Sequence, residues 1–395
     1  MFQSILRPVC ASLLGLAFAV SAAPYIPASD TQVLERLPLK PADPVARELS
    51  KLRAALTARP ADAGLAEALA RRYFELSMAE GDPRYIGYAE AVLRPWATGA
   101  AVIPPGLRVI RALLRQYKHD FGGALGDLAA AVDLNPADIE AHSWRAAIFM
   151  VQARYSDARA ECAALARHAS ELFATGCLAY VDATTGNARV AHDRLSAALQ
   201  RRPDAAPESK LWNLTRLAEM ALRLGDPALA EKHFRSALAL GVTDNFLLAA
   251  VADFLLDENR PAEVAALLQG WARSDTLLLR LAIAEKTLNM PSAAQRIQAL
   301  DDRFSEAALR GEQLHLQEEA RFRLRLKGDP AGALRLATEN WKSQREPRDA
   351  AILLESALAA RDRAAAQPAL DWLEKSGFED AGVRRTAAGV RALAP

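Results

Sequence analysis

Residues 107–136 read LRVIRALLRQYKHDFGGALGDLAAAVDLNP and contain the pattern that decides the fold. Small and aromatic residues of this stretch return further along the chain at a constant distance. The first recurrence pairs residues 34 positions apart: Ala112 with Ala146, Phe121 with Tyr155, and Ala124 with Ala158. A constant spacing of this length is typical of an array of small structural repeats.

Two further copies follow, and each keeps 12 positions between its small residues. The first comprises Ala179, Ala191, Leu195, Ala198 and Pro203, and the second comprises Ala218, Gly225, Ala230, Phe234 and Ala237. Two helices approach closely only where their side chains are small, so paired alanines are expected to mark a helix–helix contact. Larger residues such as Phe234 are expected to fill the space toward the next helix pair.

Turn signals separate the expected helices. The sequence Gly-Asp-Pro occurs at 81–83, 225–227 and 328–330, and Asn259-Arg260-Pro261 and Asn289-Met290-Pro291 resemble degenerate copies of it. In this arrangement Gly ends one helix in a left-handed conformation, Asp caps the next helix, and Pro suits its first turn. No convincing strand pattern is present, so the chain is predicted to be all-α.

This pattern resembles the tetratricopeptide repeat (TPR) family, most clearly at Ala112, Ala124, Ala131 and Pro136 and again at Ala218, Ala230, Phe234 and Ala237. The resemblance implies a right-handed superhelical solenoid. We expect about nine TPR-like hairpins over residues 62–375, a capping segment at 44–59 and a closing helix at 381–394. Extra residues around 85–88 and a loss of register after Asp275 depart from the family pattern.

The charge balance argues against several classes of partner. Lys and Arg total 49 and Asp and Glu total 48, whereas a nucleic-acid coat or a polybasic membrane patch needs an excess of cations. We therefore expect no nucleic-acid partner. The basic run Arg321 to Lys327 directly precedes Gly328, so its cations are interpreted as complementing the negative end of a helix.

The first residues form a targeting signal. Arg7 precedes the apolar run Val9 to Val20, and small residues follow, which is the layout of a secretory signal peptide over residues 1–22 with cleavage after Ala22. A Pro-rich leader at 23–44 and a repeat domain at 45–395 follow. These features predict a periplasmic or secreted bacterial protein, and an Arg- and Ala-rich composition is compatible with that source. No integral membrane segment is expected after cleavage.

Removal of the signal leaves two cysteines, Cys162 and Cys177. Their midpoint lies between Ala169 and Ser170, in the expected link between two antiparallel helices, so the cysteines face each other across a hairpin. Two interpretations stay open: a disulfide, which would be worth ~3 kcal/mol in the chain-entropy account, or two small buried thiols.

Motifs for catalysis and cofactor binding are missing from the sequence. It contains no phosphate-binding loop, no dinucleotide fingerprint, no HExxH and no GxSxG. The six His residues are dispersed, and the pair His315 and Glu318 is interpreted as a surface feature of one helix. We therefore expect no catalytic residues, no metal site and no cofactor.

The TPR resemblance implies that first-helix residues line a concave groove. The candidate partner-binding residues are Leu113, Tyr117, Met150, Phe173, Tyr180, Trp212, Glu219, Phe246 and Asp253. Aromatic anchors of this kind suit a peptide or helix, while Glu219 and Asp253 would set its polarity. Each residue can instead pack between neighbouring hairpins. The Lys and Asn of the family's carboxylate clamp are absent, because the matching positions are Val109 and Leu113, Ser143 and Ala147, and Thr215 and Glu219.

Two functions of different class follow. The first is an exported, non-catalytic TPR scaffold or adaptor that binds a protein or peptide partner in its groove, in envelope assembly, secretion or maturation of an exported complex. The alternative is a helical-shell enzyme or small-ligand-binding protein. Self-association through the groove is a third, weaker option.

Overall fold

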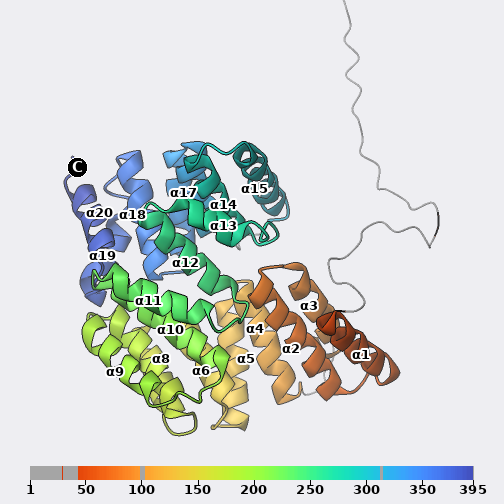
Figure 1. Cartoon of the computed structure of the whole chain (residues 1–395). Coiled ribbons are helices and arrows are strands. Elements are labelled where there is room, and N and C mark those ends of the chain that lie inside the picture. The colour runs from red at the N-terminus through yellow and green to blue at the C-terminus, as the bar shows by residue number, and fades with distance from the viewer. Residues whose placement is uncertain (1–28, 30–42, 98–102, 312–314, 395) are drawn as a thin grey trace, which may run out of the picture. The chain divides into compact units, whose positions relative to one another are not determined.

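The computed structural model describes residues 29, 43–97, 103–311 and 315–394 (Figure 1). The chain divides into two units, Met1–Ser50 and Lys51–Pro395. Helix α1 (Pro44–Ala58) begins in the first unit, and all later helices lie in the second. The predicted signal peptide lies outside the described residues, as does most of the leader.

Nine helix pairs make up most of the second unit. They are α2 (Ala63–Glu80) with α3 (Arg84–Ala97), α4 (Pro105–Tyr117) with α5 (Phe121–Leu134), α6 (Ile139–Val151) with α7 (Tyr155–Leu165), α8 (Glu171–Thr184) with α9 (Ala188–Gln200), α10 (Pro207–Arg223) with α11 (Pro227–Leu238), α12 (Asn245–Asp257) with α13 (Pro261–Leu268), α14 (Asp275–Thr287) with α15 (Ser292–Leu309), α16 (Leu316–Phe322) with α17 (Pro330–Trp341), and α18 (Pro347–Ala360) with α19 (Gln367–Ser376).

The pi-helical turn η1 (Arg323–Lys327) continues α16, and α20 (Ala381–Arg391) follows the last pair. The described residues contain no strand. The predicted fold class, an all-α array of about nine helix hairpins, is therefore confirmed. None of the described helices has the length and apolar character required to span a membrane.

The small residues of the repeat lie where the helices touch. Ala112, Ala124, Ala179, Ala191 and Ala218 are all fully buried. In pairs such as α4 with α5 and α10 with α11, the two helices are in extensive contact. Because alanine carries only a methyl group, the two backbones come close enough to exclude water from the contact.

The turns form as their sequences predict. Gly225 and Gly328 have positive φ values of 77° and 64°, and the carboxylates of Asp226 and Asp329 accept hydrogen bonds from backbone N–H groups of the following helices. Asn259 takes the same left-handed conformation with φ 56°, which Asn tolerates better than most residues. The degenerate turn therefore ends its helix as Gly-Asp-Pro does, but Arg260 provides no side-chain cap for α13.

The last hairpins return to the middle of the chain within the second unit (Figure 1). The backbone N–H of Arg345 donates to the carbonyl of Val151 at 2.7 Å, and the indole N–H of Trp372 donates to the hydroxyl of Tyr155 at 2.7 Å. The N–H of Ala188, at the start of α9, donates to the carboxylate of Glu379 at 2.8 Å. These contacts bring α18 to α20 against helices from more than 150 residues earlier.

Candidate functional site

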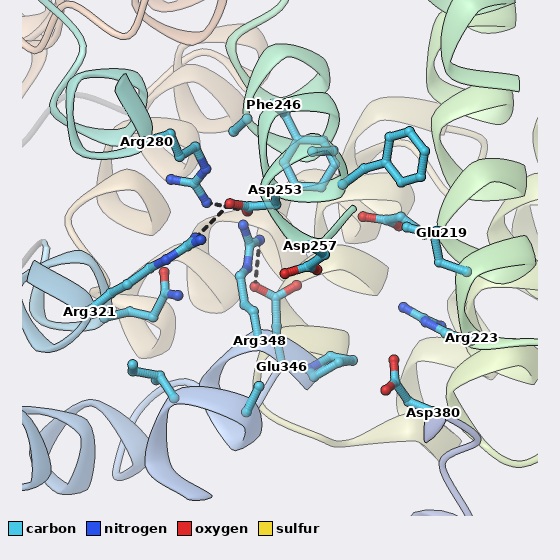
Figure 2. A pocket seen from close by; sticks show the side chains of 18 of the residues that line it. Glu219, Arg223, Phe246, Asp253, Asp257, Arg280, Arg321, Glu346, Arg348 and Asp380 are labelled. Atoms are coloured by element: carbon cyan, nitrogen blue, oxygen red, sulfur yellow. Dashed lines mark hydrogen bonds and ion pairs between the residues drawn. The ribbon is translucent and has the colours of Figure 1, made fainter. Parts of the chain in front are cut away.

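This return of the chain encloses a cavity of about 320 Å³, called here the central cavity (Figure 2). Side chains of α8, α10 and α12 line it, together with those of α16, η1 and the N-terminal half of α18. Arg280 of α14 and Asp380, which precedes α20, also contribute. Its charged lining residues are Arg216, Glu219, Arg223, Asp253, Asp257, Arg280, Arg321, Arg325, Glu346, Arg348, Glu355 and Asp380.

Helical periodicity explains why α10 and α12 present so many charges to one side. Arg216, Glu219 and Arg223 are three and four residues apart, and Asp253 and Asp257 are four apart. Residues at these spacings share one face of a helix. The opposite faces of the same helices are apolar and pack in the core with residues such as Ala218 and Leu247.

The basic run Arg321 to Lys327, at the end of α16 and in η1, has some side chains in the cavity wall and others in ion pairs away from it. Arg321 and Arg325, four residues apart, line the central cavity, whereas Arg323 pairs with Glu319 at 3.2 Å and Lys327 with Asp301 at 3.0 Å. Gly328 ends the helix as the sequence predicts, with φ 64°. The interpretation of this run as helix-end cations alone missed the two arginines that face the cavity.

Asp253 is the most strongly paired carboxylate of the cavity. Its two oxygens accept hydrogen bonds from Arg280 and Arg321, each at 2.6 Å (Figure 2). Burial opposes ionisation, but the two guanidinium charges outweigh it, so the pKa of Asp253 lies below its usual value. Asp253 is therefore ionised at neutral pH and joins α12 to α14 and α16.

Glu346 closes the cavity from the N-terminus of α18. One of its oxygens accepts a hydrogen bond from the hydroxyl of Tyr180 at 3.2 Å, and the other accepts one from Arg348 at 3.0 Å. Glu346 also forms a capping box with Asp349, whose carboxylate accepts the backbone N–H of Glu346 and a hydrogen bond from Asn340. Burial and the Glu346 charge raise the pKa of Asp349 to about 7.

Aromatic rings surround one of the arginines. The guanidinium of Arg216 lies 4.5 Å from the ring centre of Phe246, 4.7 Å from that of Tyr180 and 5.7 Å from that of Trp212. Arg348 lies 5.3 Å from the Phe246 ring, so this ring contacts two guanidiniums. Cation–π contacts of this kind hold the charged groups at the wall where water is partly excluded.

Two charged side chains of the cavity have neither a hydrogen bond nor an ion pair with the described residues. They are Arg223 and Asp257, and the guanidinium of Arg223 lies 4.8 Å from the Phe378 ring centre. Asp257 keeps solvent access through the cavity. Burial in the wall and the neighbouring charge of Asp253 raise its pKa to about 6.

The structure divides the predicted groove residues into three groups. Tyr180, Glu219, Phe246 and Asp253 line the central cavity. Phe173 and Trp212 are both 39% exposed and do not line it, although Trp212 contacts Arg216 of the cavity wall. The remaining three do not line it: Leu113 and Met150 are 1% and 4% exposed, and Tyr117 is half-buried.

Sequence reasoning missed most of the cavity's ionic residues. Arg216 and Arg223 share their helix face with Glu219, so helical spacing from that residue would have indicated them. Glu346 and Arg348 gave no such signal, because their position opposite Tyr180 depends on contacts across 166 residues of chain.

The two cysteines are joined in a disulfide between α7 and α8, with their Cα atoms 5.5 Å apart. Among the described residues, no three His, Cys, Asp or Glu side chains are grouped to hold a metal ion. His315 and Glu318 are half-buried at the start of α16.

Comparison with known proteins yields only distant structural neighbours. No family model matches the sequence, and no curated protein matches it. Solved structures with a similar course of the chain include the APC/C hetero-tetramer Cut9–Hcn1. The match has 15% sequence identity and a TM-score of 0.38, and it covers 88% of this chain and 80% of that chain. The match to yeast Tom70 has 13% sequence identity and a TM-score of 0.41, and it covers 88% of this chain and 84% of that chain.

A tetratricopeptide repeat protein from Parabacteroides merdae gives 14% identity, covers 73% of this chain and 98% of that chain, and has a TM-score of 0.28. At such low scores the fold assignment rests on the helix pairs themselves and on their buried alanines. The fold is an all-α array of helix hairpins. Helical-repeat architecture of this kind exposes first-helix side chains on one side, and here these side chains form the wall of the central cavity.

Proposed function

We propose that this protein is a non-catalytic helical-repeat scaffold or adaptor that binds a segment of a protein partner in the central cavity. One observation carries the proposal: three buried hydrogen-bond donors in the cavity wall lack acceptors among the described residues, namely Nε of Arg216, Nη1 of Arg223 and Nε of Arg280. A buried donor without an acceptor is costly, and a peptide supplies carbonyl and carboxylate acceptors. The adjoining rings of Tyr180 and Phe246 offer contact area for its side chains.

We also propose that the scaffold acts outside the cytoplasm, in envelope assembly, secretion or maturation of an exported complex. The layout of residues 1–22 supports export, and the Cys162–Cys177 disulfide suits an oxidising compartment. Sequencing the N-terminus of protein from the native envelope fraction tests export. The expected mature chain begins at Ala23, and an intact Met1 on protein retained in the cytoplasm would contradict it.

A cavity-filling variant tests the binding role without removing any contact. Ala351 of α18 lines the cavity, so Ala351→Phe would occupy its space, whereas Ala228→Phe places the same side chain on the exposed surface of α11. Both variants and the wild type are used to capture proteins from the native envelope fraction, with mass spectrometry as the readout. We expect one partner to be retained by the wild type and by Ala228→Phe and lost from Ala351→Phe.

Two other outcomes would contradict the proposal. A partner retained equally by Ala351→Phe binds elsewhere on the molecule. A defined small molecule found by native mass spectrometry in the purified wild type and absent from Ala351→Phe, with no protein captured, would favour the small-ligand or enzymatic alternative.

A further inference from the structure

The charges of the central cavity are balanced but not completely paired. Six arginines and six carboxylates line it. Glu219 pairs with Arg216, Asp253 with Arg280 and Arg321, Glu355 with Arg325, and Glu346 with Arg348. Asp380 caps α20 by accepting the N–H of Val383. One cation, Arg223, and one carboxylate, Asp257, are left without a partner among the described residues.

Arg223 is oriented to receive an anion. It is the last residue of α10, and the face of its guanidinium is covered by the Phe378 ring at 4.8 Å. Its Nη1 is buried in the wall with no acceptor. A guanidinium whose face is covered and whose edge is free binds a carboxylate through its N–H groups. Figure 2 shows its side chain at the cavity wall opposite Asp380, with no interaction drawn between them.

Asp257 is the complementary site for a cation. It is the last residue of α12 and lies near the negative charges of Asp253 and Glu355 and the positive charges of Arg321 and Arg325. Asp253 is already neutralised by two guanidiniums, but Asp257 receives no hydrogen bond. A ligand ammonium or guanidinium at this position would donate a charge-assisted hydrogen bond to the Asp257 carboxylate.

The separation of the two groups limits the length of the ligand. Both end first helices of consecutive hairpins, and α10 and α12 pack against each other. Packed helix axes are about 8–10 Å apart, which equals about three residues of extended peptide at ~3.3 Å each. The ring of Phe246 lines the wall on α12, where it offers an apolar surface to the intervening residues.

We propose that the central cavity recognises a peptide segment with a basic and an acidic group about three residues apart, the basic group on Asp257 and the acidic group on Arg223. This inference rests on the proposed function and specifies its ligand. The acidic group is a carboxylate, supplied by a side chain or by the peptide's C-terminus. Binding such a segment leaves the formal charge of the cavity unchanged and supplies both unpaired groups with partners.

A selection experiment tests this charge pattern. A random peptide library is selected against the full mature chain, against Arg223→Gln and against Asp257→Asn. Matched controls are Arg235→Gln and Glu258→Gln, which remove exposed charges outside the cavity. We expect wild type and controls to enrich peptides with both charges, Arg223→Gln to lose the preference for the acidic group, and Asp257→Asn to lose the preference for the basic group.

The affinity of a peptide selected on the wild type should fall about tenfold or more in each cavity variant, because each loses one charged hydrogen bond. Arg223→Glu should recover binding when the peptide's acidic residue is replaced by Lys. Amidating the C-terminus distinguishes the two sources of the carboxylate, since only a peptide that uses its terminus then loses binding. Thermal melting checks that each variant is folded, and Arg223→Lys, which keeps the cation, should retain the acidic preference.

Enrichment by the wild type without a charge preference, or an unchanged preference in both cavity variants, would overturn this inference while leaving the proposed function standing. If no peptide is enriched, or if enriched peptides bind Ala351→Phe as well as they bind the wild type, the proposed function itself fails and this inference with it.

Discussion

The first helices of the early and the middle hairpins occupy equivalent places in the repeat but have different surroundings. On α4 and α6, Leu113 and Met150 are buried in apolar packing, and Met150 contacts a cluster that includes Cys162. On α10 and α12, Glu219 and Asp253 face a cavity enclosed by α16 and α18. Position in a repeat therefore does not decide whether a residue is exposed to a ligand. The segment that packs on the opposite side decides it.

The largest expected effect concerns the ionic wall of the middle hairpins. Among the described residues, Asp253 is the only carboxylate that pairs with Arg280, whose side chain is 5% exposed, and Asp253→Ala removes it. We expect the free energy of unfolding to fall by about 4 kcal/mol, because a buried guanidinium is left uncompensated. Urea denaturation followed by circular dichroism measures it. A loss below about 1 kcal/mol would show that this cavity wall tolerates unpaired charge.

The apolar packing of the early hairpins is tested by a pair of truncations. Leu113→Ala should cost about 3 kcal/mol, since it leaves a void in a packed region. Phe173→Ala, at a first-helix residue that is 39% exposed, should cost less than about 0.5 kcal/mol. Equal losses in urea denaturation would remove the distinction between packed and open first-helix positions.

The unpaired carboxylate of the cavity predicts a gain in stability. Because the pKa of Asp257 is raised to about 6, the folded state binds a proton more tightly than the unfolded state, and stability falls as pH rises from about 4 to 6. Asp257→Asn should therefore raise the free energy of unfolding at pH 7 by about 1 kcal/mol, after allowance for solvent screening. The midpoint of urea denaturation should move to a higher concentration. Glu258→Gln should have no such effect. Destabilisation by Asp257→Asn would mean that the carboxylate has a partner.

A pair of histidines, of which His192 is buried and His233 is half-buried, predicts the opposite pH dependence. The Nε2 atoms of His192 and His233 are 3.4 Å apart, and burial together with His192 lowers the pKa of His233 to about 4. In the unfolded chain His233 is protonated below about pH 6.5, whereas in the folded chain it is protonated only below about pH 4. The free energy of unfolding therefore falls as the pH drops from about 6.5 to 4.

Because the His233 ring is partly exposed and screened, the loss over this window should be below about 1 kcal/mol. His233→Gln should abolish it, and His168→Gln, at an exposed position, should not. Melting temperatures at pH 4.5 and 7 supply the measurement. An unchanged pH dependence in His233→Gln would assign the effect to other groups.

Prediction from sequence was accurate where the determinants are local. The alanine spacing and the Gly-Asp-Pro turns act within one hairpin, and they led to the all-α repeat and its helix pairs. For the groove, four of nine candidates line the cavity. The resemblance indicated which helices present a face, but the burial of Leu113 and the pairing of Asp253 depend on neighbours that no local pattern encodes.

What the sequence determined by itself is the hairpin repeat, because small residues and turn residues set helix contacts and helix ends over short distances along the chain. The tertiary structure alone decided the central cavity, since its two walls come from hairpins far apart in sequence, as in the hydrogen bond between Tyr180 and Glu346. That contact also decided which charges are neutralised. Arg223 and Asp257 have no partner among the described residues, because Glu346 pairs with Arg348 and Arg321 pairs with Asp253.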